Sequence, residues 1–441
     1  MKTSTHTKIA AVTVLLVLLA GAAQAQAIQT WKSGKTTVTL SNNGTLRVSA
    51  IGVFRNENLA PAGIMKNYRH DDEPPWHDYK SLITAVIIEK GVIDIGYMAF
   101  YGCENIKSVT IPNSVIGIGS YAFHGCKSLT SLTIPKSVQV ISGYTFSNCP
   151  GLTSINVSKG NKSLRSIDGV LFSINHREKQ SLVQQLTGKN NETLTLYRYP
   201  AGRQGAYTIP GNVTRIIANA FGGSTGLTSL TIPGSVKIDS YGELLASDCI
   251  NLTSINVDND NPHYSSIDGV LFNKDATTLI RYPEGKRGAY TIPNGVTEIG
   301  DMAFYNNTNL TSVTIPDGVT HIVDEAFVGC TNLISVKIPS SVTSIGAFAF
   351  GWCKALPSVT IPSSVTSIEE LAFDFCDNLT SVTSLNPIPP DIDRDGLGRG
   401  LPENITLYVP NGSIDAYRNA AGWKDFGRIK PIASGSEAHF R

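Results

Sequence analysis

The sequence repeats itself with a fixed period, and this feature constrains the fold more than any other. Isoleucine-proline pairs recur along the chain, and neighbouring pairs within each group lie 23 residues apart. A fixed period of this length is typical of a solenoid, in which each repeat forms one coil and packs only against its neighbours. The isoleucines of these pairs are Ile111, Ile134, Ile209, Ile232, Ile292, Ile315, Ile338 and Ile361.

One unit indicates which part of each coil is a strand. Leu129, Leu132 and Ile134 have the spacing L-x-x-L-x-I, and Thr133 stands between the last two. Alternation with a period of two places Leu132 and Ile134 inside and Thr133 outside a short strand. Pro135 has no N–H to donate, so it ends the strand. Stacked units therefore predict a parallel sheet along one side of the solenoid.

The same period predicts what fills the interior. A single coil cannot bury its own apolar face, so we expect the repeat phenylalanines to stack into one continuous core. Each cysteine occupies one repeat position, which predicts buried free thiols rather than disulfides or a zinc site. The phenylalanines are Phe100, Phe123, Phe146, Phe221, Phe304, Phe327, Phe350 and Phe373, and the cysteines are Cys103, Cys126, Cys149, Cys249, Cys330, Cys353 and Cys376.

The N-terminus predicts export. Lys2 and Lys8 precede an apolar run from Ile9 to Ala20, and small residues follow it, which is the pattern of a cleaved signal peptide. We therefore expect a protein that is secreted or displayed at the cell surface, with no transmembrane segment after signal cleavage. Charged residues make up 16% of the chain and the formal net charge is +1, so there is no basic field to gather nucleic acid.

Two segments interrupt the repeat. The sequence Ser-Ile-Asp-Gly-Val-Leu-Phe at 166–172 recurs at 266–272, and each copy begins a predicted hairpin module. Each module ends on a second shared motif, which starts at Tyr199 in the first copy and at Tyr282 in the second. The first copy carries 17 extra residues between Ser173 and Leu196.

The unit Ser131-Leu132-Thr133-Ile134-Pro135, followed by Phe146-x-x-Cys149, resembles the BspA-like leucine-rich-repeat family of bacterial surface proteins. The resemblance covers roughly residues 81 to 385. It implies a leucine-rich-repeat solenoid of 23-residue units with short parallel strands, a β-rich N-terminal cap, two hairpin modules and a C-terminal cap. It also implies a secreted or cell-surface protein that binds or adheres to a host or microbial macromolecule.

The expected organisation follows from the repeat, the interruptions and this resemblance. The boundaries are 1-27 for the signal peptide, 28-80 for the N-terminal cap, 81-157 for repeats, 158-208 for the first hairpin module with its insertion, 209-257 for repeats, 258-291 for the second module, 292-385 for repeats, 386-432 for the C-terminal cap and 433-441 for a tail.

Two groups of side chains are candidate binding residues. Basic and aromatic residues gather in the modules, where we expect an exposed patch, with cross-strand packing of the tyrosines as the alternative. A second candidate is a pair of aromatics in neighbouring repeats, at a position where glycine stands elsewhere; packing near the cap is the alternative. The module residues are Tyr197, Arg198, Tyr199, Arg203, Arg281, Tyr282, Lys286 and Arg287, and the aromatic pair is Trp352 and Phe375.

An acidic loop is a weak calcium candidate. Asp391, Asp393 and Asp395 copy the opening of a calcium loop, but Pro402 stands where a bidentate glutamate is needed, and a solvated turn is the alternative. We expect no cofactor.

The sequence contains no catalytic motif, so we expect a binding protein rather than an enzyme, with a protein or glycan on a host or microbial surface as its partner. Two alternatives stay open, a glycan-active enzyme built on a solenoid and a structural spacer without a ligand.

Overall fold

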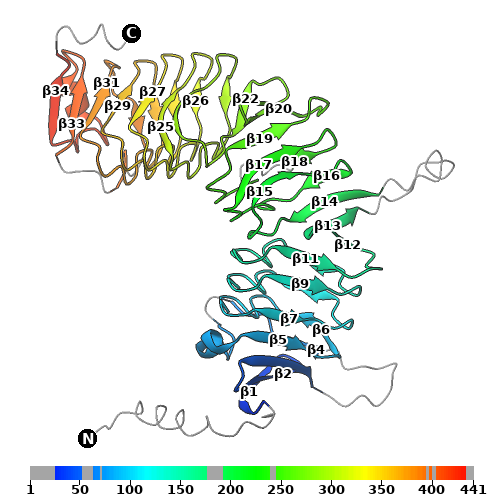
Figure 1. The fold of residues 1–441 in the computed structure, drawn as a ribbon. Helices are drawn as coiled ribbons and strands as arrows, with labels where there is room; N and C mark the ends of the chain where they lie inside the picture. The colour runs from blue at the N-terminus through cyan, green and yellow to red at the C-terminus, as the bar shows by residue number, and fades with distance from the viewer. Residues whose placement is uncertain are drawn as a thin grey trace, which may run out of the picture.

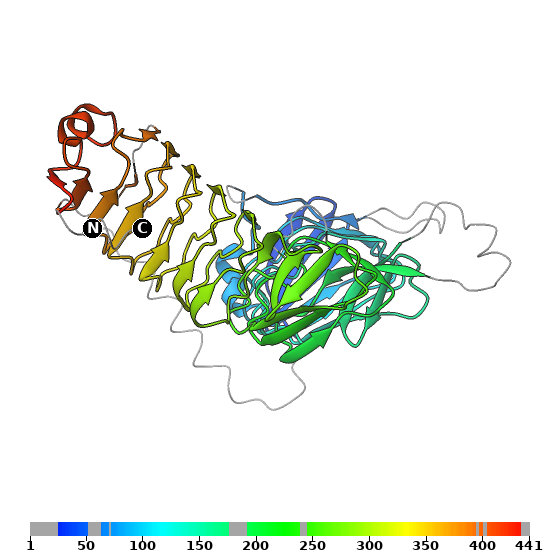
Figure 2. The same cartoon turned by 90° about the horizontal axis from the view of Figure 1, so that it is seen from above.

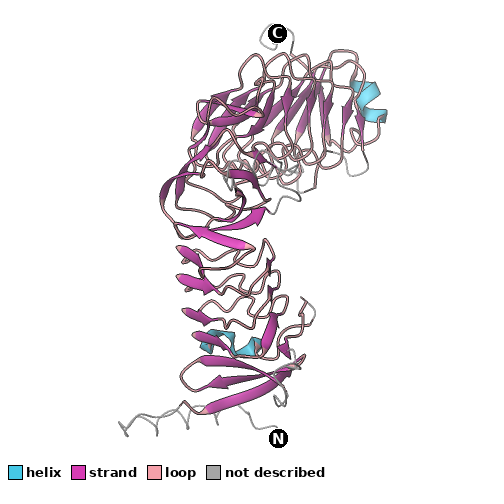
Figure 3. Ribbon diagram, turned by 90° about the vertical axis from the view of Figure 1, so that its right-hand side faces the viewer, coloured by secondary structure: helices cyan, strands magenta, loops and turns pink. Residues whose placement is uncertain are grey.

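The computed structural model describes residues 25–51, 63–69, 72–175, 192–238, 245–393, 397–399 and 404–433, and the structural statements below concern these residues. Most of the predicted signal peptide, residues 176–191 of the first module, Asp395 and nearly all of the predicted tail lie outside them. The described chain is a solenoid of stacked coils, in which short strands joined by turns make up nearly all of the regular secondary structure (Figures 1 and 3). None of its helices has the length and apolar character needed to cross a membrane.

The first face of each coil is the predicted short strand. In β9 (Ser131–Ile134), Leu132 and Ile134 are buried and Thr133 is exposed, which confirms the alternation. The next strand on this face pairs with β9 in parallel and places Ile155 opposite Leu132, so the inward side chains fall in register. The other strands of this face are β5 (Ala85–Ile88), β7 (Ser108–Thr110), β11 (Ser154–Val157), β15 (Gly205–Thr208), β17 (Leu227–Ile232), β19 (Ser254–Val257), β23 (Gly288–Thr291), β25 (Leu310–Thr314), β27 (Ser335–Lys337), β29 (Ser358–Ile361), β31 (Ser381–Ser384) and β33 (Thr406–Val409).

A second row of strands, which the sequence analysis did not predict, forms another face. These strands pair in parallel with their neighbours in each run of repeats. Most of them bury one aliphatic side chain, such as Ile345 in β28, and the four-residue strands β6 and β16 bury two. They are β4 (Gly63–Ile64), β6 (Val92–Ile95), β8 (Gly117–Ile118), β10 (Val140–Ile141), β16 (Val213–Ile216), β18 (Lys237–Ile238), β24 (Glu298–Ile299), β26 (His321–Ile322), β28 (Ser344–Ile345), β30 (Ser367–Ile368) and β32 (Asp391–Ile392).

The third side of each coil is a turn, which in most repeats carries the repeat phenylalanine, the repeat cysteine or both. The ring of Phe327 is fully buried, with its centroid 4.7 Å from that of Phe304 and 5.2 Å from that of Phe350. The Cys330 thiol donates a hydrogen bond to the Phe304 carbonyl of the preceding coil at 3.2 Å, and burial raises its pKa to about 12. All seven cysteines are free and buried, which confirms the prediction.

Each hairpin module inserts an antiparallel hairpin into the second face. The first two strands of a module pair with each other, and the third returns antiparallel to the second and parallel to the next strand of the solenoid. The strands are β12 (Leu164–Ile167), β13 (Val170–Asn175) and β14 (Thr193–Arg198) in the first module, and β20 (Tyr264–Ile267), β21 (Val270–Asn273) and β22 (Thr278–Arg281) in the second.

The expectation of one continuous core is corrected, because the middle strand of each hairpin divides it. Side chains on a strand point alternately to its two faces. In β13, Leu171 packs into the preceding core cluster, whereas Val170 and Phe172 pack into the next. Leu271 and its neighbours in β21 repeat this division. The buried residues therefore form three clusters, and the rod changes direction over these modules, with the C-terminal coils extending away from the rest (Figures 1 and 2).

Both ends of the solenoid are covered. At the N-terminal end, η2 (His77–Leu82) follows Trp76, whose indole N–H donates to the Ala99 carbonyl at 3.0 Å and whose ring stacks on Phe100. At the C-terminal end, the indole of Trp423 is fully buried and donates to the Pro390 carbonyl at 2.8 Å. The remaining elements are β1 (Ala27–Ser33), β2 (Thr36–Ser41), β3 (Thr45–Ala50), α2 (Ile414–Asn419) and β34 (Arg428–Pro431).

Candidate functional site

The structure places four of the predicted module residues inside the protein rather than on an exposed patch. Arg198, Tyr199, Arg281 and Tyr282 are each 1% exposed, so the expectation of a surface patch is corrected for them. The tyrosines continue the phenylalanine stack, with ring centroids 5.3 Å apart between Tyr199 and Phe221 and 5.0 Å apart between Tyr282 and Phe304. They fill the core at the coil where the hairpin replaces an ordinary repeat.

Three of the other module residues are tied to backbone carbonyls. Tyr197 donates to the Ile141 carbonyl, and Arg203 donates to the carbonyl of Asp168 at the tip of the first hairpin. Lys286 makes the equivalent bond, 2.7 Å long, to the carbonyl of Asp268 in the second hairpin. These contacts fasten the hairpins to the rod. Arg287 is exposed.

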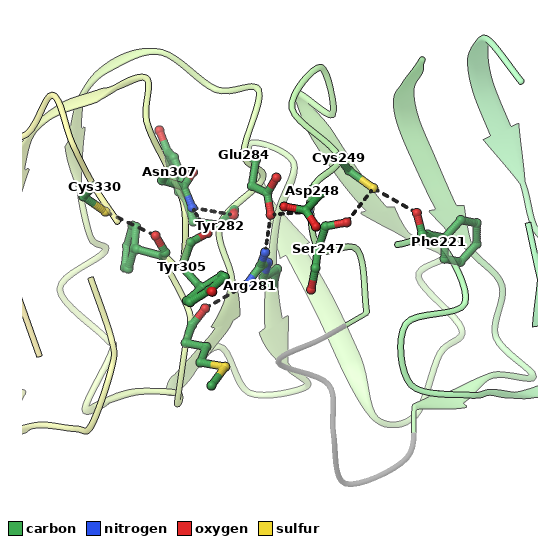
Figure 4. A network of polar contacts seen from close by, with 12 residues as sticks. Phe221, Ser247, Asp248, Cys249, Arg281, Tyr282, Glu284, Tyr305, Asn307 and Cys330 are labelled. Atoms are coloured by element: carbon green, nitrogen blue, oxygen red, sulfur yellow. Dashed lines mark hydrogen bonds and ion pairs between the residues drawn. The ribbon is translucent and has the colours of Figure 1, made fainter. Parts of the chain in front are cut away.

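The two buried arginines have different partners. The Arg198 guanidinium donates to the carbonyls of Asn219 and Gly222, both at 2.9 Å. Arg281 donates to the Met302 carbonyl at 2.8 Å and to Glu284 Oε1 at 2.6 Å (Figure 4).

Glu284 is 2% exposed and also accepts the backbone N–H of Asp248 at 3.1 Å. Burial raises the pKa of Glu284 to about 7, even though the neighbouring Arg281 lowers it. This network is interior and joins two coils.

The aromatic pair stays on the surface. Trp352 and Phe375 are 37% and 39% exposed, and their ring centroids lie 5.4 Å apart. The ring of Phe348, four residues earlier in the same coil, also stacks with that of Trp352, with the centroids 6.3 Å apart. We refer to Phe348, Trp352 and Phe375 as the aromatic stack. The rings of Trp352 and Phe375 stack from one coil to the next, and both stay more than a third exposed.

The backbone of this pair is left-handed, as it is at the same repeat position of other coils, where glycine, Asn148, Asp248 or Asn306 stands. Trp352 and Phe375 have φ values of 56° and 52°, in the left-handed region that side chains other than glycine seldom adopt. The equivalent Gly102, Gly125 and Gly329 have φ values of 69°, 73° and 74°. A bulky residue there costs about 1 to 2 kcal/mol relative to a relaxed backbone. The chain thus holds two exposed aromatics at a position that favours glycine.

A polar pair lies beside the stack. Lys354 and Asp377 each stand two residues after one of the aromatics, and their charged groups are 3.6 Å apart. Both side chains are about half exposed. An exposed apolar centre with a polar rim is the usual arrangement of a protein interface.

The acidic loop is described in part. Asp391 begins the two-residue strand β32, which pairs with β30 of the second face, and Asp393 follows it. Asp395 lies outside the described residues. Among those described, no group of three or more histidine, cysteine, aspartate or glutamate side chains has an arrangement that could hold a metal ion.

The repeat agrees with a known family. A family model described as the BspA type leucine rich repeat region matches residues 78–187, 203–287 and 286–389, in six copies. The chain belongs to the BspA-type leucine-rich-repeat family. No curated protein matches it.

Solved structures of leucine-rich-repeat and surface proteins are similar to this BspA-type chain. A leucine-rich repeat protein from Eubacterium ventriosum is 23% identical, with a TM-score of 0.47, and the alignment covers 93% of this chain and 97% of that one. A leucine rich cell surface protein from Faecalibacterium prausnitzii is 24% identical, with a TM-score of 0.49 and coverage of 94% and 97%. The pneumococcal vaccine antigen PcpA is 17% identical, with a TM-score of 0.49 and coverage of 92% and 99%.

Two features of this BspA-type solenoid escaped the sequence analysis. Tyr97, Tyr121 and Tyr144 form a second run of neighbouring rings on the turn side, with centroids 5.8 and 5.2 Å apart. Lys337 stands at an outward strand position that holds threonine in neighbouring coils. It lines a groove at the ends of the first-face strands, away from the turns that carry the phenylalanines. Tyr121 and Tyr144 share a repeat position, but Tyr97 lies 24 residues before Tyr121 and one place out of step, so the run of three was overlooked. The groove depends on several coils together and gives no local signal.

Proposed function

We propose that this BspA-type protein is exported and binds an extracellular protein through the aromatic stack. The observation that carries this proposal is the left-handed backbone of two exposed aromatic residues at a glycine position. Strained residues persist when the surrounding structure holds them, and they concentrate at functional sites. Large aromatic side chains are also the residues that most often anchor protein interfaces.

The rigid scaffold supports the same role. The backbone N–H groups of Trp352 and Phe375 bond to the carbonyls of Asp374 and Arg399 in the following coil, at 2.7 and 3.0 Å. The stack is therefore ordered before a partner arrives, and docking costs little conformational entropy. Exposed aromatic rings suit contact with a protein surface, and the ion pair of Lys354 and Asp377 supplies a polar rim.

Replacing both aromatics by the glycine of other coils tests the proposal. We expect the Trp352→Gly, Phe375→Gly double variant to lose about tenfold or more in affinity for its partner, the loss typical of interface anchors. The released strain offsets the lost stacking and the greater freedom of glycine in the unfolded chain, so the free energy of unfolding should change by about 1 kcal/mol or less.

Binding to an array of extracellular matrix and bacterial surface proteins is the measurement, and urea unfolding checks stability. Asn306→Gly is the matched control, because Asn306 occupies the same position in another coil with a φ of 55°. Its binding should equal that of the unaltered chain. If the unaltered chain retains no protein from the array, the result would indicate a spacer without a ligand. If the double variant binds as tightly as the unaltered chain, the protein would bind through a different surface.

No observation favours the glycan-active enzyme. Such an enzyme needs two carboxylates that flank a sugar in a groove. In the groove that Lys337 lines, Asp317 is the single carboxylate among the lining residues that the structure describes.

A further inference from the structure

A groove of about 710 Å³ lies on the C-terminal coils, where the strands of the first face end at residues such as Pro339 and Pro362. Its lining residues fall into rows that run along the solenoid axis. The apolar row contains one side chain from each of five successive coils, as the strand pairing shows for the last four. Its members are Pro339, Pro362, Leu385, Pro410 and Ile432.

Polar side chains flank the apolar row on both sides. Asp317, Ser340 and Ser363 occupy the next position along the chain, at intervals of 23 residues. Lys337 and Thr360 occupy the outward position of the strand that precedes the proline. At its N-terminal coils the groove thus has hydroxyl groups and charges along both edges of the apolar row, whereas the apolar row alone continues through all five coils. Within that row Leu385 and Pro410 are partly exposed, and Pro339, Pro362 and Ile432 are buried.

The distance between successive members of the apolar row equals the spacing of neighbouring strands, and this distance indicates which kind of polymer fits the groove. Neighbouring strands lie about 4.8 Å apart. An extended polypeptide advances about 3.1 to 3.4 Å per residue, so its side chains leave register with the coils after two or three residues. An extended chain of sugar rings advances by close to one ring per strand spacing. A sugar ring offers an apolar C–H face to the partly exposed Leu385 and Pro410, and hydroxyl groups to the polar edges.

One charge distinguishes the groove from the rest of the first face. Lys337 stands where neighbouring coils have Thr314 and Thr360, and its side chain is exposed. Among the described residues it forms no ion pair, not even with Asp317 at the same end of the groove. An ammonium group on the edge of a sugar-sized strip favours a ligand that carries carboxylates.

We propose that this groove binds a linear polysaccharide whose sugar rings carry carboxylates, with one ring packed against each coil. Lys337 bonds to a carboxylate, and Asp317, Ser340, Ser363 and Thr360 bond to hydroxyl groups. The site is separate from the aromatic stack, which lies at the opposite end of the first-face strands, and it does not depend on the protein partner proposed there.

Titration calorimetry with two β-linked oligosaccharides of equal length tests this proposal. Oligomannuronate carries a carboxylate on each ring, and the matching oligomannose carries none. The unaltered chain should bind oligomannuronate more tightly than oligomannose by about fivefold to tenfold, as one partly exposed charge-assisted hydrogen bond provides. Added salt should reduce this preference.

Two variants locate the site. Lys337→Thr restores the residue of neighbouring coils, so it should fold normally, lose the preference for oligomannuronate and still bind both sugars weakly. Ser363→Trp places a large ring on the strip, and it should abolish binding of both sugars. Lys136→Thr is the control, because Lys136 follows the equivalent proline in an N-terminal coil outside the groove.

The proposal is overturned if neither sugar binds the unaltered chain, if Lys337→Thr keeps the full preference, or if Ser363→Trp binds as the unaltered chain does. The Trp352→Gly, Phe375→Gly variant should bind both sugars normally. Sugar binding by this variant therefore tests the groove proposal independently of the proposal that the aromatic stack binds a protein.

Discussion

The buried pair of Arg281 and Glu284 predicts an unusual dependence of stability on pH. Burial raises the pKa of Glu284 from its ordinary value of 4.5 to about 7. Its Oε2 atom is buried and has no hydrogen-bond partner among the described residues, so the ionised form is poorly compensated. A rise in pKa from 4.5 to about 7 means that the folded protein favours the protonated form of Glu284 over the ionised form by about 3 kcal/mol more than the unfolded chain does.

The sign follows from which state binds the proton more tightly. The folded protein holds the Glu284 proton up to about pH 7, whereas the unfolded chain releases it near pH 4.5. The contribution of protonated Glu284 is therefore fully present below pH 4.5 and is lost as the pH rises through about 7. Glu284→Gln removes this titration. Relative to the unaltered chain, the variant should gain about 3 kcal/mol of stability between pH 4 and pH 8.

Urea unfolding at a series of pH values measures the difference in free energy between the two proteins. Glu298→Gln is the control, because Glu298 is an exposed carboxylate on the neighbouring strand β24. Its difference from the unaltered chain should stay small at every pH. A flat difference for Glu284→Gln would refute the reasoning, because it would mean that Arg281 keeps Glu284 ionised in the folded protein throughout.

Three further predictions concern the core and its fastenings. Phe327→Ala should cost about 3 to 5 kcal/mol in urea unfolding, because the ring is fully buried between two others, whereas Phe375→Ala should cost about 1 kcal/mol or less; equal costs would contradict the stacked core. The seven thiols should resist an alkylating reagent in the folded protein at pH 8 and all react in denaturant, because burial raises their pKa; rapid labelling of native Cys353 would contradict this. Lys286→Ala should increase hydrogen exchange at the tip of the second hairpin and leave the first unchanged; unchanged exchange at both tips would show that the bond to Asp268 does not fasten the hairpin.

The period of the sequence was sufficient to predict the coil and its contents. The spacing of Leu132 and Ile134 predicted the first row of strands, and the shared position of the cysteines predicted buried thiols. The second row of strands was missed because a two-residue strand such as β28 contains no alternation to detect. Its existence depends on pairing with the coils above and below.

The module residues were misplaced for a related reason. Arginine and tyrosine side by side are typical of an exposed patch, and burial of Arg281 requires the carbonyl and carboxylate acceptors that only the folded coils bring together. One signal was present in the sequence. Tyr199 and Tyr282 each lie 22 residues before a repeat phenylalanine, close to the period of 23, so both could have been assigned to the core.

The candidate sites differ in how far the sequence could predict them. Trp352 and Phe375 were found because they replace glycine at a fixed repeat position, although their backbone conformation and their ring contact came from the structure. The groove could not be predicted, since Leu385 and Ile432 join its apolar row only through the pairing of strands beyond the regular repeat.

The central claim is that the repeat residues build the rod and that a few exposed departures from the repeat bind ligands. The most direct measurement returns these departures to the repeat in one chain, with Trp352→Gly, Phe375→Gly and Lys337→Thr combined, and compares its binding to protein and acidic glycan arrays with that of the unaltered chain. The account predicts an unfolding free energy within about 1 kcal/mol of the original and the loss of specific retention on both arrays. A folded triple variant that retains the original binding profile would contradict it.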